Sequence, residues 1–441
     1  MIDLQDRPAT GRPALIAVDL TPMLPGGENG GAKLLVLELL RELSVRFPQS
    51  GFLLLTHGLT HDELAALDAP NVRRLLVSGG TPAQRGRRDQ LKRALRRIVR
   101  LLPRPAAVRA ARLASGLARR RWRGPSLRSR GVDLLFCPFT APVYREPGLP
   151  TVCTVYDLQA RAYPQFFTVE DAAHREAAFT AACRDADLLV AISDFTRAGV
   201  VASSVAPGKV RTIYPCVVHG RDGARAAPEP DALRTLGVEP SSYLIYPANF
   251  WRHKNHDLLL SAFAVASREG LRPDLKLLLT GAPSPRADWL AHAAQALGIG
   301  GRVVLAGFVG DGTLAQLLAQ ARGLVFPSLY EGFGMPVVEA MDAGVPVACS
   351  EAAALPEVCA GAALMFDARR PLEIAAAIKR IDQDEALRRQ LIELGRRRAA
   401  EFCDSAAHAD RYWNAFQCAW AKKAGPRSAD SAVRRTPSRL W

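Results

Sequence analysis

Short apolar runs alternate with amphipathic helical stretches along most of this 441-residue chain. The runs ALIAVDL, GFLLLTH and TVCTVYD come early, and SYLIYPA, LKLLLTG and RVVLAGF come later. Helical patterns such as AKLLVLELLRELSVRF lie between them. Strand, helix and strand at this spacing form right-handed βαβ units, whose strands pair in parallel. The alternation therefore predicts α/β domains built on parallel sheets.

The apolar runs form two series, separated by a stretch rich in Gly, Pro, Ala and charged residues. The length and the 49% apolar content are sufficient for two separate cores. We expect an N-terminal Rossmann-like domain at 1–217, a linker at 218–237 and a second Rossmann-like domain at 238–405. A helix at 406–422 is expected to cross back to the first domain, and the polar tail at 423–441 is expected to be disordered.

Most of the net positive charge comes from residues 81–130. This segment contains 17 Lys and Arg residues and the single acid Asp89, whereas the whole chain has a formal charge of +15. Within it, RDQLKRALRRIVRLLPR predicts a basic amphipathic helix, which either docks on an anionic membrane surface or packs on the first domain. Nucleic acid is the weaker alternative, because no aromatic residues are interleaved with the arginines.

The membrane and redox signals indicate a cytoplasmic protein. No apolar window reaches the roughly 20 residues that a membrane-spanning helix needs, and no export signal is evident. The eight cysteines are scattered without a CxxC motif or a metal-binding spacing, so we expect reduced thiols. Docking of residues 81–130 would make the protein peripheral on the inner face of the membrane.

The stretch SLYEGFGMPVVEAMDAGVPV places Glu331 and Glu339 around a Gly-Phe-Gly turn. It follows an apolar run, and ligands of open parallel sheets bind beyond the carboxyl ends of the strands. Pro336 and Gly344 predict a short helix between them, whose first turn offers N–H groups to a phosphate. Carboxylates beside a phosphate avoid repulsion by binding hydroxyl groups instead. The pattern therefore predicts a site for a nucleoside-diphosphate sugar.

Two further loops carry groups suited to a diphosphate. Arg252 and Lys254 lie in FWRHKNH, just before a helix that we expect to be capped by Asn255. The stretch LPGGENGGAK lacks the Lys-Ser/Thr ending of a P-loop. Its Gly30 and Gly31 can still admit a diphosphate or an acceptor beside a helix N-terminus.

EGFGMPVVEAMDAGVPV resembles the E-x7-E signature of retaining glycosyltransferases of family 4. That family has the GT-B architecture, an α/β fold of two Rossmann-like doubly wound domains facing a central cleft. The resemblance implies that Glu339 binds the ribose hydroxyls and that Glu331 contacts the donor sugar. It also implies further donor-binding residues in the same loop: Gly332, Phe333, Gly334 and Met335.

By the same resemblance, Arg252 and Lys254 hold the diphosphate as it leaves, and the nucleobase meets the chain near Phe308 and Val309. The acceptor attacks from the front face, and the leaving phosphate takes its proton. In TVYDLQ, Tyr156 stands where many relatives have a histidine. The resemblance therefore leaves Asp157 only a contact with the donor or the acceptor.

No metal or other cofactor is expected, because the Asp-x-Asp pairs at 185–187 and 382–384 do not follow a strand. The resemblance implies a hexosyltransferase that acts on a saccharide or lipid-linked acceptor in surface polysaccharide or glycolipid synthesis. The likeness to the family, particularly in FWRHKNHDLLL and ENGGAK, favours GDP-mannose as the donor. The alternatives are a sugar-nucleotide epimerase, a phosphorylase, or a basic membrane or nucleic-acid adaptor with a degenerate cleft.

Overall fold

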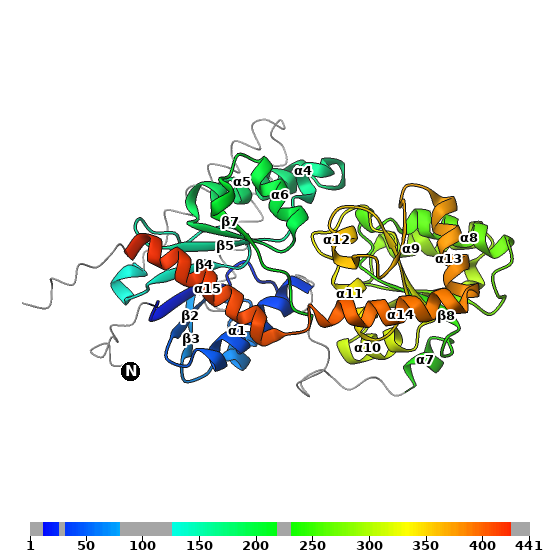
Figure 1. Cartoon of the computed structure of the whole chain (residues 1–441), viewed down its shortest axis with the longest axis horizontal. Coiled ribbons are helices and arrows are strands. Elements are labelled where there is room, and N and C mark those ends of the chain that lie inside the picture. Colours follow the sequence, from blue (N-terminus) through cyan, green and yellow to red (C-terminus); the bar gives the residue numbers. More distant parts are fainter. Residues whose placement is uncertain (1–11, 26–30, 80–125, 218–230, 425–441) are drawn as a thin grey trace, which may run out of the picture.

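Two parallel sheets form the cores of two domains that lie side by side (Figure 1). This computed structural model describes residues 12–25, 31–79, 126–217 and 231–424. The predictions made for Gly30, for most of the basic segment, for most of the linker and for the tail from residue 425 lie outside the described residues.

The first sheet has seven parallel strands in the order β3-β2-β1-β4-β5-β6-β7. The strand order reverses between β1 and its neighbour β4, which makes the carboxyl end of β1 a position where parallel sheets bind ligands. The strands are β1 (Leu15–Asp19), β2 (Gly51–His57), β3 (Val72–Ser78), β4 (Leu134–Cys137), β5 (Thr151–Val155), β6 (Leu188–Ala191) and β7 (Val210–Thr212).

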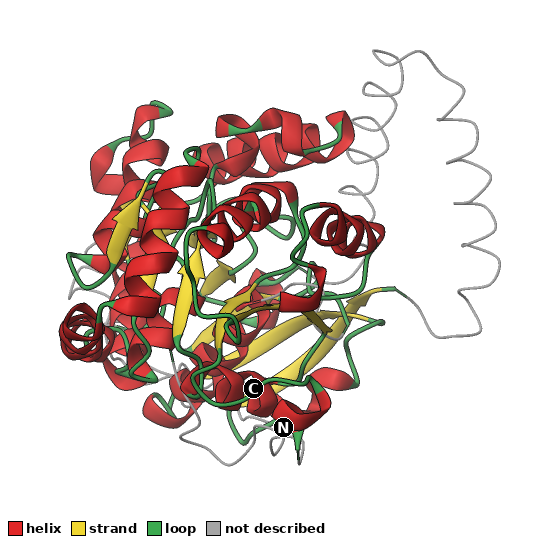
Figure 2. Cartoon of the chain, turned by 90° about the vertical axis from the view of Figure 1, so that its right-hand side faces the viewer, coloured by secondary structure: helices red, strands yellow, loops and turns green. Residues whose placement is uncertain are grey.

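Helices pack around the strands of the chain (Figure 2), and several of them belong to the first domain. These α-helices are α1 (Gly31–Arg46), α4 (Gln159–Ala162), α5 (Val169–Asp185) and α6 (Asp194–Ala202). Short 3₁₀ turns complete the domain: η1 (Glu63–Leu67), η2 (Arg128–Arg130), η3 (Pro164–Phe166) and η4 (Pro207–Lys209).

The buried face of α1 includes a lysine and leaves out a leucine. Leu34 is 45% exposed, whereas Lys33 is buried. The Lys33 ammonium donates to the Leu24 carbonyl at 3.0 Å and pairs with Glu63 at 2.5 Å, which compensates for its burial. Four apolar residues of α1 contribute to the core: Val36, Leu39, Leu40 and Leu43.

The second sheet repeats the topology of the first, in the order β10-β9-β8-β11-β12-β13. Its reversal lies between β8 and β11, so the loops after these two strands are neighbours. The strands are β8 (Tyr243–Pro247), β9 (Lys276–Thr280), β10 (Val303–Gly307), β11 (Gly323–Phe326), β12 (Val347–Ser350) and β13 (Leu364–Phe366).

Eight α-helices and two 3₁₀ turns accompany the second sheet in the described part of the chain. They are α7 (Ala232–Thr235), η5 (Arg252–Lys254), α8 (His256–Arg268), α9 (Pro285–Ala296), η6 (Gly300–Arg302), α10 (Asp311–Ala319), α11 (Met335–Asp342), α12 (Leu355–Cys359), α13 (Pro371–Gln383) and α14 (Glu385–Ala400).

The chain finally returns to the first domain through α15 (Ser405–Ala424), the red helix of Figure 1. The Trp413 ring stacks on Phe47 of the first domain with the ring centroids 4.1 Å apart. Tyr412 and Phe416 pack on Phe136 of β4. Burial of these aromatic rings makes α15 part of the first core.

The predicted fold of two Rossmann-like domains is confirmed. Strands β3 and β13 lie at sheet edges and were not predicted. Among the described residues, no helix is long and apolar enough to cross a membrane. All eight cysteines fall within the described residues and are free.

Candidate active site

An ion pair lies where the loops after β8 and β11 meet. Lys254 Nζ and Glu331 Oε1 are 2.6 Å apart, and the two side chains are only 13% and 14% exposed. The backbone joins the loops nearby, because the Leu329 N–H donates to the His253 carbonyl at 2.8 Å. The structure thus brings together a base and an acid that are far apart in the sequence.

The Tyr246 hydroxyl connects the two loops that carry this ion pair. It donates to the Lys254 carbonyl at 2.9 Å and lies 2.9 Å from Ser328 Oγ. Tyr246 and Ser328 are fully buried, so the loops after β8 and β11 share a buried polar contact.

The other residues of the basic loop behave differently from Lys254. Arg252 is exposed and forms no ion pair with the described part of the chain. The prediction that Asn255 caps α8 through its side chain is wrong. Asn255 has a left-handed backbone (φ 60°), and its amide donates to the carbonyls of Pro327 and Ala368 at 3.1 and 2.8 Å. Asn255 therefore ties the basic loop to the glutamate loop.

Helix α11 begins directly after the Gly-Phe-Gly turn, one residue earlier than predicted. Gly334 precedes it with φ 106°, a conformation that glycine adopts without strain, and Gly344 follows it with φ 73°. Glu339 lies one turn inside the helix and is partly buried. Helix α11 thus begins at the end of the loop that contains Glu331, and a helix N-terminus favours an anion.

The start of α1 in the first domain lies against the start of α11. Gly31 is the first residue of α1, and a Cβ added there would lie 3.0 Å from Met335 Sδ. The first residues of two helices from different domains are thus close together.

The first domain also contributes the loop after β5. A Cβ on Gly332 would overlap the Tyr156 carbonyl oxygen, so only glycine allows this approach. The Leu158 N–H donates to the Tyr330 hydroxyl at 3.2 Å. Burial raises the pKa of Asp157, which lies close enough to feel the charges of Glu331 and Lys254. Asp157 of the opposite domain thus lies near the ion pair, and its Cβ would be 3.3 Å from a Cβ added at Gly332.

Two predicted donor contacts lie further out. Phe308 is 69% exposed at the carboxyl end of β10, and Val309 packs partly against the second core. Phe333 is 2% exposed and packs on Tyr214 and Phe402, with ring centroids 6.2 and 5.2 Å away. The Phe333 side chain therefore faces the core, which leaves only its backbone for a ligand.

Two histidines in the basic loop are buried and neutral. Burial lowers the pKa of His253 to about 4 and that of His256 to about 3. The His256 ring lies between Tyr246 and Phe250, and neither ring nitrogen has a hydrogen-bond partner among the residues that the structure describes. No cluster of metal-ligating side chains occurs in the described ranges.

The substitution His256→Phe is expected to reduce acid destabilisation. The folded His256 stays neutral down to about pH 3, whereas the unfolded residue protonates near pH 6.5. The unfolded state therefore binds more protons in this window, and stability falls as the pH falls, by roughly 2 kcal/mol at about pH 5. Urea unfolding near neutral pH and at about pH 5 measures this loss. Equal losses in His256→Phe and in the exposed control His292→Phe would contradict the burial argument.

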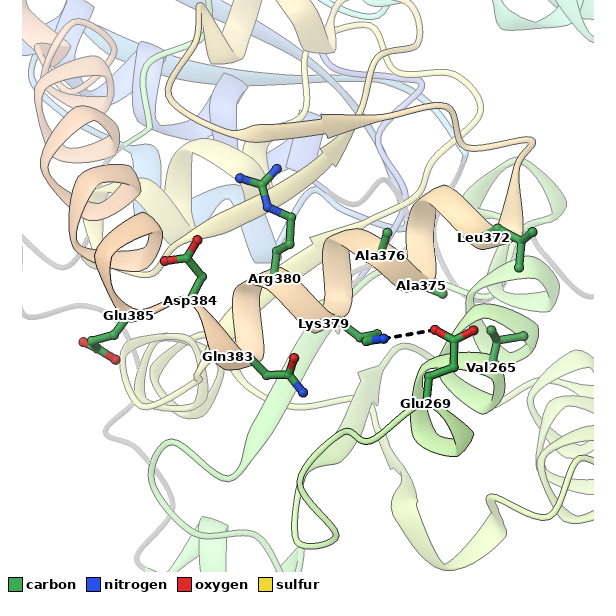
Figure 3. Close-up of a pocket in the computed structure, with 10 residues that line it drawn as sticks. All are labelled: Val265, Glu269, Leu372, Ala375, Ala376, Lys379, Arg380, Gln383, Asp384 and Glu385. Carbon is green, nitrogen blue, oxygen red and sulfur yellow. Dashed lines mark hydrogen bonds and ion pairs between the residues drawn. The ribbon is translucent and has the colours of Figure 1, made fainter.

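A separate groove of about 680 Å³ lies on the second domain (Figure 3). The end of α8, helix α13 and the start of α14 line it, and Lys379 points to Glu269 across it at 3.1 Å. None of its lining residues comes from the loops around Lys254 and Glu331, so we do not assign it to the same site.

Contacts between the domains include residues that sequence reasoning missed. Tyr330 receives the Leu158 N–H, and Arg369 donates to the Tyr163 hydroxyl at 2.9 Å. Glu357 of α12 accepts two backbone N–H groups of α6. The only signal for Glu357 in the sequence is an acid after Pro356 at a helix start, which normally indicates a local cap.

Residues 234–398 match the family model described as Glycosyl transferases group 1. The second domain thus matches the group 1 glycosyltransferases. The matched range contains both glutamates of the turn, the basic loop and α12. The matched residues 234–398 therefore include both Lys254 and Glu331, which the second sheet brings together.

Two curated relatives of this chain carry transferase names. O-antigen chain mannosyltransferase B of Escherichia coli is 30% identical over 255 residues, covering 57% of this chain and 66% of the relative. The MMP alpha-(1->4)-mannosyltransferase of Mycolicibacterium hassiacum is 41% identical over 111 residues, covering 24% of this chain and 26% of the relative. The chain thus spans only part of the length of these relatives.

Solved structures share the arrangement of both domains. Anabaena HepE, in complex with UDP and glucose, has a TM-score of 0.64 at 18% identity, covering 92% of this chain and all of HepE. WaaG, a glycosyltransferase involved in lipopolysaccharide biosynthesis, has a TM-score of 0.60 at 17% identity, covering 91% of this chain and 99% of WaaG. The fold is therefore that of the GT-B glycosyltransferases.

Proposed function

We propose that this chain is a retaining family 4 glycosyltransferase that moves a hexose from a nucleoside-diphosphate sugar to an acceptor hydroxyl. The observation that carries the proposal is the nearly buried pair of Lys254 and Glu331, which lies where the loops after β8 and β11 meet, with Asp157 of the other domain nearby. The group 1 match of the second domain supports it.

The donor would lie along the carboxyl edge of the second sheet. Glu339 binds the ribose hydroxyls, and the nucleobase reaches the loop at Phe308 and Val309. The diphosphate lies at the start of α11, where backbone N–H groups and the helix dipole favour an anion. Gly332 and Gly334 let the backbone approach the sugar and phosphate without a Cβ in the way.

Lys254 and the exposed Arg252 supply the positive charge for the leaving group. Glu331 orients the Lys254 ammonium in a nearly buried position. A diphosphate oxygen then becomes a second acceptor for the same ammonium, while Glu331 also contacts the donor sugar. Lys254 and Glu331 thus bind the donor as an ion pair, one at the diphosphate and the other at the sugar.

The chemical step breaks the bond between the sugar C1 and the diphosphate oxygen, and the electron pair goes to the diphosphate. Lys254, Arg252 and the N–H groups of α11 stabilise that developing charge. The acceptor hydroxyl attacks C1 from the face that the diphosphate leaves and passes its proton to the departing phosphate oxygen. Asp157 orients a hydroxyl of the donor or the acceptor. The step needs no metal and no covalent nucleophile.

GDP-mannose is the proposed donor, and a saccharide or lipid-linked acceptor in surface polysaccharide or glycolipid synthesis is the proposed acceptor. The names of two relatives, both mannosyltransferases and one of them acting on an O-antigen chain, support these choices. The basic residues 81–130 would dock the enzyme on the anionic cytoplasmic face of a membrane.

A screen of nucleotide sugars tests the proposal. The purified protein is incubated with GDP-mannose, UDP-glucose and related donors in the presence of a metal chelator, and release of the nucleoside diphosphate is followed. We expect the fastest release from GDP-mannose. Absence of release from every donor would contradict the proposed function, and sugar 1-phosphate formed on adding inorganic phosphate would indicate a phosphorylase.

A further inference from the structure

Glu357 of α12 reaches from the second domain to the first. Its two carboxylate oxygens accept the backbone N–H groups of Asp194 and Phe195, each at 2.9 Å. These are the first two residues of α6, which carry N–H groups that the helix itself leaves unpaired. A carboxylate at this end also interacts favourably with the helix dipole.

The local cap of α6 leaves these two N–H groups to Glu357. Ser193 is the N-cap residue, and its hydroxyl accepts the Thr196 N–H at 3.0 Å. The Asp194 carboxylate is engaged with the Thr212 and Tyr214 hydroxyls, at 2.5 and 3.0 Å. Glu357 therefore completes a helix cap that the first domain only half provides.

On the other side, α12 is held firmly in the second domain. Arg398 of α14 donates to the carbonyls of Glu357 and Val358 at 2.7 and 2.9 Å. The Ala354 N–H, just before α12, donates to the Glu331 carbonyl at 3.3 Å. Helix α12, which carries Glu357, is therefore connected by a backbone hydrogen bond to the loop that contains the ion pair.

We propose that Glu357 is a positioning residue, whose cap on α6 holds the two domains in the arrangement that brings Asp157 to Lys254 and Glu331. This inference rests on the proposed transfer reaction for its effect on catalysis. The charge of Glu357 matters in this role. Burial raises the pKa of the Glu357 carboxyl, whereas the bonds from Phe195 and Asp194 lower it and so favour the charged form.

Hydrogen exchange tests the contact without any substrate. In Glu357→Ala, exchange of the Asp194 and Phe195 amides is expected to rise by about tenfold or more, because both lose their acceptor. The Thr196 amide keeps its Ser193 acceptor and should change little. Glu393→Ala is the matched control, because the Glu393 side chain is 66% exposed and pairs with Arg397 of the same helix. Unchanged exchange at Asp194 and Phe195 would overturn the proposal.

Kinetics test the catalytic consequence. In Glu357→Ala the turnover number with the preferred donor should fall by about 10-fold to 100-fold while donor affinity stays near that of the wild type, because the proposed ribose and nucleobase contacts at Glu339, Phe308 and Val309 lie in the second domain. Glu357→Gln keeps one acceptor oxygen, so its turnover number should lie between those of the wild type and Glu357→Ala. Full turnover in Glu357→Ala despite faster exchange would also overturn the proposal. Failure of wild-type turnover would instead count against the proposed function, and the exchange result would still decide the contact.

Discussion

Replacing Lys254 with alanine is expected to lower the rate of sugar transfer by at least about 100-fold, as loss of a single preorganised donor to a developing anion does in other enzymes. The Lys254 side chain is only 13% exposed, and Glu331 holds its ammonium in place at 2.6 Å. Most of the loss should appear in turnover, because the charge on the diphosphate grows as the bond breaks. Initial rates with saturating donor measure it.

Two further variants separate this catalytic effect from a loss of folding. Lys254→Ala leaves Glu331 as an unpaired charge with little exposure, which costs on the order of 3–5 kcal/mol of stability. The double variant Lys254→Ala, Glu331→Gln removes that charge and should recover stability while staying inactive. Lys379→Ala breaks a surface ion pair of the same domain and should keep full activity. Retention of more than about a tenth of the wild-type rate in Lys254→Ala would contradict the role of Lys254.

Replacing Gly332 with alanine is expected to lower turnover by roughly 100-fold or more, through a different cause. The new Cβ would overlap the Tyr156 carbonyl. This carbonyl belongs to the backbone just after β5, so it cannot move aside as a flexible side chain can. The domains would have to separate, which takes Asp157 away from Lys254 and Glu331. Donor affinity should change much less than turnover, and small-angle scattering should show a larger radius of gyration.

Gly301→Ala is the control for this substitution. Gly301 lies in η6 of the same domain, and an added Cβ there meets no atom within 4 Å. It should therefore leave turnover and dimensions unchanged. If Gly332→Ala kept wild-type turnover, the close approach of the Tyr156 loop would have no part in catalysis.

The central strands of both sheets could be predicted because they are continuous apolar runs. Strand β8, for example, is buried along its whole length. Strand β3 contains Arg73 and Arg74 at the sheet edge, and β13 has only three residues, so neither gives a clear pattern. An edge position alone does not remove the signal, because β10 also lies at a sheet edge and was predicted from its apolar run.

The site could be predicted in parts but not as an assembly. Local patterns indicated Glu331 and Lys254 separately, because each lies in a loop after an apolar run. Their direct contact depends on the pairing of β8 with β11, which the sequence does not display. The side chain of Asn255 illustrates the same limit. A local cap was predicted, whereas the left-handed backbone directs the amide to carbonyls more than 70 residues away.

The contacts between the domains were beyond sequence reasoning altogether. Glu357 and the start of α6 are 163 residues apart, and each has an ordinary local explanation. Only the relative placement of the two sheets shows that one completes the cap of the other. The same holds for Gly332, whose need for glycine comes from Tyr156 of the other domain rather than from its own turn.

Proton NMR of the transfer reaction tests the central claim most directly, because it shows both that the sugar leaves the nucleotide and in which configuration it arrives. The preferred donor is followed with and without an acceptor saccharide, in wild type and in Lys254→Ala. We predict that the first product formed by the wild type has the anomeric configuration of the donor, and that Lys254→Ala forms almost none. A product of inverted configuration, or equal product from both proteins, would contradict the retaining reaction at Lys254 and Glu331.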